Sequence, residues 1–235
     1  MARGFMVAPN PAPGVLGTPT PLEVAGTVTG SMLADQLYCE ALLDQRLRSG
    51  HYRSLKPGEA RRIARLMVEA IGSHGEWGVE RLTVVGEAAG VYWAISPDAV
   101  VVSSGRVVGL VRARLRRRLR AYESDYALLE IAALVLEGQG LLGEDPVLAV
   151  AVAETGEALA QALAHALRPP KPRPGSGDGW VVSTRIHDPQ AARGLASDLA
   201  GYWLGRRPPR PNPRACRSCP LRGSCPYSRG TPRFN

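Results

Sequence analysis

Apolar residues recur at helical spacing in five stretches of the chain. In the first stretch Leu33, Leu37 and Leu47 share one side, and Ser31 stands where a helix cap is expected. The third stretch is apolar on most of its sides, so we expect this helix to be buried against a sheet. The predicted helices are Ser31–Leu47, Gly58–Ile71, Ser124–Gln139, Gly156–Leu167 and Asp188–Leu204.

Short runs of β-branched and apolar residues, bounded by turn-forming residues, predict strands. The runs between the second and third helices are joined by turns too short for parallel crossovers, such as Ser103-Ser104-Gly105. They should form a meander of short strands bent around a core, and the class predicted is mixed α/β. The predicted strands are Arg81–Gly86, Gly90–Ile95, Asp98–Val102, Arg106–Leu115, Val147–Ala153 and Trp180–Ile186.

The chain of 235 residues, 45% of them hydrophobic, can form one large domain with its own core. We expect an irregular arm over residues 1–25, a folded body over residues 26–205 and an Arg-rich tail over residues 206–235. Residues 168–179 read as an exposed Pro- and Gly-rich linker. No run of about 18 apolar residues occurs, which predicts no membrane span. The broken apolar stretch near the N-terminus does not fit a signal peptide, so the expected location is the cytoplasm.

The net charge is +8, and the basic residues are almost all arginine, since Lys56 and Lys171 are the only lysines. Arginine binds phosphate with two parallel hydrogen bonds and stays charged. A GC-rich or thermophilic genome would also favour arginine over lysine. Codon preference does not explain the excess of positive charge, which indicates a polyanionic partner such as nucleic acid.

The four cysteines lie at the two ends of the chain. Cys39 falls inside the first predicted helix, and Cys216, Cys219 and Cys225 form a C-x2-C-x5-C run near the C-terminus. Four thiolates are the ligands that a structural zinc or an iron–sulfur cluster takes, whereas disulfides are rare in intracellular chains of this size. We therefore expect one metal site that joins the two ends of the domain.

These cysteines, together with Thr29-Gly30-Ser31 and Pro97-Asp98, resemble the CRISPR-associated RecB-type nucleases, the fourth of the Cas series. The resemblance runs from about Gly26 to Tyr227. It implies a restriction-endonuclease-like (PD-(D/E)XK) core, a bent mixed sheet flanked by helices, with an iron–sulfur-bound C-terminal segment. It also implies that Cys39, Cys216, Cys219 and Cys225 hold the cluster, [4Fe–4S] rather than [2Fe–2S], with zinc as the runner-up.

The same resemblance implies a nuclease site, which this chain keeps only in part. Asp98 stands where the family has a metal-binding Asp, but Arg112-Ala113-Arg114 replaces the family's Glu-x-Lys, and Arg61 lies near the place of its His. Guanidiniums beside one carboxylate repel magnesium or manganese and attract phosphate. Asp98 is then a catalytic remnant, and the expected nucleic-acid-binding residues are Arg61, Arg112, Arg114, Arg116, Arg117 and Arg118.

Three functions remain open on the sequence. The first is a DNA-binding family member that no longer cuts and acts in spacer acquisition or DNA processing, with CRISPR adaptation proteins as partners. The second is an active metal-dependent nuclease that uses Asp98 with Glu80, Glu87 or Glu123. The third is a structural subunit of a protein complex, held together by its cluster.

Overall fold

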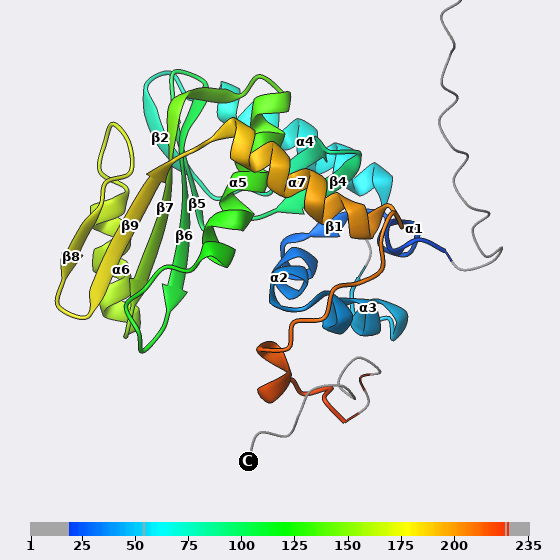
Figure 1. Ribbon diagram of the computed structural model, residues 1–235. Coiled ribbons are helices and arrows are strands. Elements are labelled where there is room, and N and C mark those ends of the chain that lie inside the picture. Colours follow the sequence, from blue (N-terminus) through cyan, green and yellow to red (C-terminus); the bar gives the residue numbers. More distant parts are fainter. Residues whose placement is uncertain (1–18, 54, 224, 226–235) are drawn as a thin grey trace, which may run out of the picture.

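The computed structural model describes residues 19–53, 55–223 and 225, and the predictions made for the remaining residues lie outside this range. Two sheets form the frame of the molecule (Figure 1). The large sheet has the order β2-β5-β6-β7-β9-β8 and the small one the order β1-β4-β3. The strands of the large sheet are β2 (Trp77–Glu80), β5 (Ala99–Ser103), β6 (Arg106–Leu115), β7 (Leu142–Ala153), β8 (Gly175–Gly177) and β9 (Trp180–Ile186).

Within the large sheet only β6 and β7 run parallel, and α5 (Glu123–Gly138) connects them. A parallel pair needs such a crossover, whereas short turns join the antiparallel pairs β5–β6 and β8–β9. The class predicted from the sequence, mixed α/β, is confirmed. Strands β6 and β9 have the bounds expected from the pattern.

The predicted meander is divided between the two sheets. Strands β3 (Val84–Ala88) and β4 (Val91–Ile95) pair with each other in the small sheet, where the short β1 (Val28–Thr29) joins β4 in parallel. Strands β5 and β6 belong to the large sheet instead. The change of sheet falls at Ser96-Pro97-Asp98, and Pro97 has no N–H with which to continue a ladder.

Helix α5 lies at the centre of the molecule, as predicted from its apolar surface (Figure 1). Every residue from 125 to 136 is buried, and the helix packs on both sheets and on α7 (Pro189–Trp203). The opposite face of the large sheet is covered by α6 (Gly156–Ala166), through Ala162 and Ala166. Helix α4 (Pro57–Gly72) packs on the small sheet through Ala60.

The first predicted helix is in fact two. Helix α2 (Gly30–Tyr38) ends and α3 (Glu40–Arg48) begins on either side of Cys39, whose φ of −169° and ψ of 115° are those of extended backbone. The Cys39 carbonyl accepts the amides of Leu42 and Leu43, so Cys39 starts the second helix. The apolar periodicity continues across the break, which is why the sequence pattern did not reveal it.

The sequence pattern also did not predict several short elements of secondary structure. Residues up to 25 were expected to be irregular, yet α1 (Pro21–Ala25) forms there, because Thr20 and Glu23 cap it reciprocally. The expected linker contains β8, which pairs with β9. A 3-10 helix, η1 (Ala215–Arg217), forms near the C-terminus. No helix in the described part of the chain is long and apolar enough to cross a membrane.

Candidate functional site

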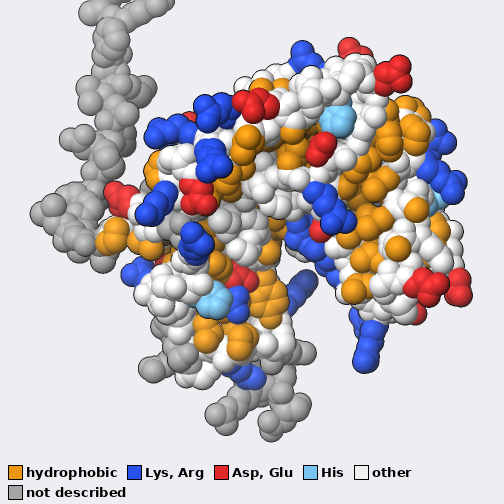
Figure 2. Space-filling view, turned by 180° about the vertical axis from the view of Figure 1, so that it is seen from behind, with side chains coloured by type: hydrophobic (Ala, Val, Ile, Leu, Met, Phe, Trp, Pro, Cys, Tyr) orange, Lys and Arg blue, Asp and Glu red, His pale blue; other side chains and the backbone are white. Residues whose placement is uncertain are grey.

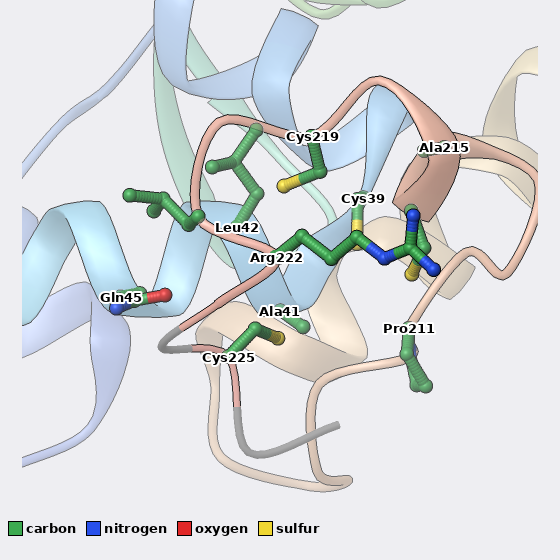
Figure 3. A pocket seen from close by; sticks show the side chains of 11 residues that line it. Cys39, Ala41, Leu42, Gln45, Pro211, Ala215, Cys219, Arg222 and Cys225 are labelled. Atoms are coloured by element: carbon green, nitrogen blue, oxygen red, sulfur yellow. The ribbon is translucent and has the colours of Figure 1, made fainter. Parts of the chain in front are cut away.

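The four cysteines line one pocket, although residues 39 and 216 are far apart in the chain (Figure 3). We call it the cysteine pocket; its other lining residues include Ala41, Leu42 and Arg222. Cys39 reaches it from the break between α2 and α3, and Cys216 from η1. The side chains around the thiols form a small apolar cluster of their own. The structure thus brings together the four residues that were predicted as ligands.

Hydrogen bonds hold the segment before Cys216 against the end of α2. The side-chain amide of Asn212 donates to the carbonyl of Tyr38 at 2.8 Å, and its backbone N–H donates to Sγ of Cys39 at 3.3 Å. The Tyr38 hydroxyl donates to the carbonyl of Ala215 at 3.2 Å. An N–H donor to a cysteine sulfur stabilises the thiolate form, which is the form that ligates metals.

The donor set fits a soft metal ion or an iron–sulfur cluster, because both take four cysteine thiolates. Burial raises the pKa of the Cys216 thiol, and the three neighbouring cysteines raise it further. The Cys216 thiol therefore lies within electrostatic reach of the other three cysteines. As the side chains lie, however, no three Cys, His, Asp or Glu residues among those described are grouped tightly enough to hold a metal ion.

Glu40, next to Cys39, fastens the same C-terminal segment and was not singled out from the sequence. Its carboxylate is 5% exposed and accepts from both terminal nitrogens of Arg207, at 2.5 and 2.7 Å. It also accepts from Nε2 of Gln36 at 3.0 Å and from the backbone N–H of Arg210 at 2.7 Å. Burial alone would raise the pKa of Glu40, but these hydrogen bonds lower it below its ordinary value. The sequence signal that could have identified Glu40 is an acidic residue among the apolar residues of a predicted helix.

Three of the predicted phosphate-binding arginines surround one buried carboxylate. The shortest approaches to Asp125 are 3.9 Å for Arg112, 3.1 Å for Arg114 and 2.6 Å for Arg116. We call Arg112, Arg114 and Arg116 the arginine cluster. Their side chains alternate along the end of β6 and the residue after it, so they project to one side, where α5 begins. Asp125, whose side chain is 3% exposed, was not predicted as a partner.

The cluster is only partly neutralised. Burial would raise the pKa of Asp125, but hydrogen bonds from Arg116, from the backbone N–H of Tyr122 and from Arg114 lower it. The carboxylate is therefore ionised and offsets one of three positive charges. Arg112 makes no hydrogen bond to it, and its Nε is buried without a partner among the described residues.

The remaining predicted residues lie around this cluster or apart from it. Arg117 and Arg118 are exposed in the loop between β6 and α5. Arg61 is exposed on α4, and among the described residues no ion pair or hydrogen bond joins it to the cluster. Asp98 accepts the backbone N–H of Ala113 at 2.8 Å and lines a different hollow, with Leu159 and Leu163 of α6.

The three acids that the sequence offered as metal ligands of an active nuclease have other surroundings. Glu80 pairs with His74 at 2.8 Å, and Glu123 forms a bidentate pair with Arg185. Glu87 lines another hollow, with Leu134 and Arg193. In the described part of the chain these three acids do not assemble with Asp98 into a group that could hold a metal ion.

Comparison with known proteins gives no match by sequence and weak likenesses among solved structures. No protein-family model matches the chain, and no curated protein matches it significantly. Among solved structures, the crystal structure of SSO0001 aligns with 13% identity and a TM-score of 0.40, over 86% of each chain. The crystal structure of LHK-Exo in complex with dAMP has the same identity and TM-score, over 78% of this chain and 90% of that one. Likeness at this level assigns neither a fold family nor an activity.

Proposed function

We propose that this protein binds the phosphate backbone of nucleic acid through the arginine cluster and does not cut it. The observation that carries the proposal is the cluster itself, in which three guanidiniums surround one carboxylate and leave two positive charges. Magnesium requires several oxygen ligands, and here arginines occupy the place where such ligands would lie. The side chains of Arg114 and Arg116 are about a quarter exposed, so a phosphate group can reach their guanidiniums and accept hydrogen bonds from them.

The surroundings of the cluster support the same function. Figure 2 shows Lys and Arg side chains at many places on one face, among apolar side chains and some acids, and a few of them border the hollow between the two halves of the molecule. The net charge of +8 attracts a polyanion from a distance. Our proposal keeps the family suggested by the sequence, a CRISPR-associated RecB-like nuclease with a restriction-endonuclease-like core, in which this member serves DNA processing or spacer acquisition.

The proposal includes an iron–sulfur cluster held by Cys39, Cys216, Cys219 and Cys225, with zinc as the alternative occupant. When bound, either would link the two ends of the chain and contribute on the order of 10 kcal/mol to folding, as structural zinc sites do. Asn212 would donate its N–H to one ligating sulfur, and Glu40 would hold the segment that carries the other three ligands.

The proposed metal site is tested by measuring the metal content of the purified protein. Replacing Cys219 by serine should remove iron from anaerobically purified protein, together with its visible absorption, because one of four thiolate ligands is lost. Ser218→Ala is the matched control, since Ser218 lies between two of the cysteines and should leave the metal content unchanged. Wild-type protein that carries zinc would select the alternative, and protein with neither metal would contradict this part of the proposal.

Nucleic-acid binding is tested by its dependence on salt. Arg114→Gln should weaken binding of DNA uniformly across sequences and reduce the slope of log affinity against log salt by roughly 1, as expected for one lost phosphate contact. Arg106→Gln is the control, because Arg106 is exposed at the opposite end of the same strand. Fluorescence anisotropy over a salt series measures both.

Three results would overturn the proposal in different ways. Equal affinities and slopes for both variants would remove the arginine cluster from the binding surface, and no binding at all would favour a structural subunit. Magnesium- or manganese-dependent cleavage of DNA that disappears in Asp98→Ala would show an active nuclease instead. Co-purification with the CRISPR integrase tests the partner that the family suggests.

A further inference from the structure

A buried acid on α5 faces a cavity beside the arginine cluster. Glu130 is 8% exposed, and its Oε2 lies 2.5 Å from Nδ1 of His187. His187, whose side chain is 1% exposed, follows β9 and donates its backbone N–H to the carbonyl of Pro146. This pairing fixes the orientation of the Glu130 carboxylate. Its other oxygen, Oε1, makes no hydrogen bond within the part of the chain that the structure describes.

The cavity has a volume of about 400 Å³ and lies where four elements meet. Its apolar walls come from α2, α5 and α7, while Ser124, Glu130 and Arg185 supply polar groups. Pockets of this size bury small organic ligands, with a few polar groups fixing the orientation. The lining residues are Leu37, Glu123, Ser124, Ala127, Glu130, Arg185, Ala191, Ala192 and Leu195.

The cavity and the arginine cluster share the first turn of α5. Tyr122 and Asp125 hold the cluster, while Glu123, between them, holds Arg185 at the cavity. Arg185 also stacks on the ring of Tyr126 at 3.5 Å, which keeps its guanidinium beside the cavity. Glu123, Ala127 and Glu130 lie on the other side of α5 from Asp125, so a strand with its phosphates on the cluster would reach the cavity by crossing the first turn of this helix.

We propose that this cavity takes one unstacked base of a bound single strand and that Glu130 accepts hydrogen bonds from its N–H groups. A carboxylate is an acceptor only, so it favours a base edge with adjacent N–H donors. Guanine offers N1–H and the N2 amino group side by side. Thymine offers a single N–H between two carbonyl oxygens, which the carboxylate repels. Proteins read unstacked bases in this manner, with apolar side chains against the ring.

This inference rests on the proposed nucleic-acid binding, because only a bound strand delivers a base to the cavity. Its test is fluorescence anisotropy with the full-length protein and labelled oligothymidylate that carries either no guanine or one central guanine. The guanine strand should bind about tenfold more tightly, since one well-placed bidentate base contact discriminates by about that much. Inosine in place of guanine, which lacks the N2 amino group, should lose part of the preference.

Glu130→Gln should abolish the preference for guanine, measured as the ratio of the affinities for the two strands, because the loss of one negative charge affects both strands alike. Gln at this position can still accept from His187, and thermal melting checks that the variant is folded. Glu137→Gln is the matched control, because Glu137 lies two turns further along α5 and pairs with Arg193 instead. Ala127→Leu fills the cavity without altering Glu130 and should also abolish the preference.

The outcomes separate this inference from the function on which it rests. If wild-type protein binds both strands equally, or if the preference persists in folded Glu130→Gln, the cavity does not read a base, although the protein still binds nucleic acid. If no strand binds, the proposed function and this inference both fail.

Discussion

Replacing Asp125 by alanine is expected to lower the free energy of unfolding by about 3–5 kcal/mol, the range for breaking a buried ion pair by removing one partner. The substitution leaves the guanidiniums of Arg114 and Arg116 partly buried without their acceptor. It also removes the carboxylate that accepts the backbone N–H of Tyr122 at the start of α5. Denaturant unfolding followed by circular dichroism measures the loss.

Glu123→Ala is the control for this prediction. Glu123 precedes Asp125 by two residues and also pairs with an arginine, but its side chain is 86% exposed. An exposed pair contributes about 0–1 kcal/mol, so this variant should unfold almost like the wild type. Equal losses in the two variants would show that Asp125 does not organise the cluster.

The charge of Asp125 can be separated from its shape with Asp125→Asn. Because this variant adds one net positive charge to the arginine cluster, it should bind DNA more tightly than the wild type while being less stable. A structural role of the cluster alone predicts lower stability with unchanged DNA affinity. Salt-dependent binding measured on the folded variant decides between the two.

The pH dependence of stability follows from the same residue. The pKa of Asp125 is lower in the folded protein than in the unfolded chain, so the native state holds fewer protons. The stabilisation is complete above the unfolded pKa and is lost as the pH falls through the folded pKa. Asp125→Asn should remove this part of the acid sensitivity, which urea unfolding at a series of acidic pH values detects.

Replacing Glu40 by alanine is the second large effect that we expect. The loss should again be about 3–5 kcal/mol, because the buried guanidinium of Arg207 would lose its carboxylate partner. The amides from Arg207 to Ala215 should then exchange with solvent faster, since Glu40 connects this segment to the start of α3. Hydrogen exchange of the metal-free protein isolates this effect from that of the cysteines.

Asp198→Ala provides the comparison for Glu40. Asp198 also binds Arg210 and approaches Arg207, but its side chain is 53% exposed. We expect a change below about 1 kcal/mol and little change in exchange. Unaltered exchange in Glu40→Ala would mean that the tail is held by other contacts, such as those of Asn212.

Several features of the fold could be read from the sequence because they depend on neighbours along the chain. The period of apolar residues gave the helices α4 to α7, and alternation gave β6 and β9 at their full length. The predicted start of the last helix at Asp188 is also local, since the Asp188 carboxylate accepts the amides of Gln190 and Ala191 and caps α7.

Other features depend on residues that are distant in sequence. The break at Cys39 leaves the apolar period intact, so only the contact with the C-terminal segment distinguishes it. The pairing of β3 and β4 apart from β5 and β6 depends on which sheet each strand meets. Local patterns do not contain this information, because strand pairing is a non-local interaction.

The sequence by itself determined which side chains are present: four cysteines at the two ends of the chain, an excess of arginine, and Arg112 and Arg114 at the end of a predicted strand. Only the tertiary structure decided how these groups are used. It placed the cysteines around one pocket, gave the arginines a shared partner in Asp125, and set Glu130 against a cavity. The physical reason is that the charge state and hydrogen bonding of a side chain depend on burial and on neighbours in space, which the order of residues does not specify.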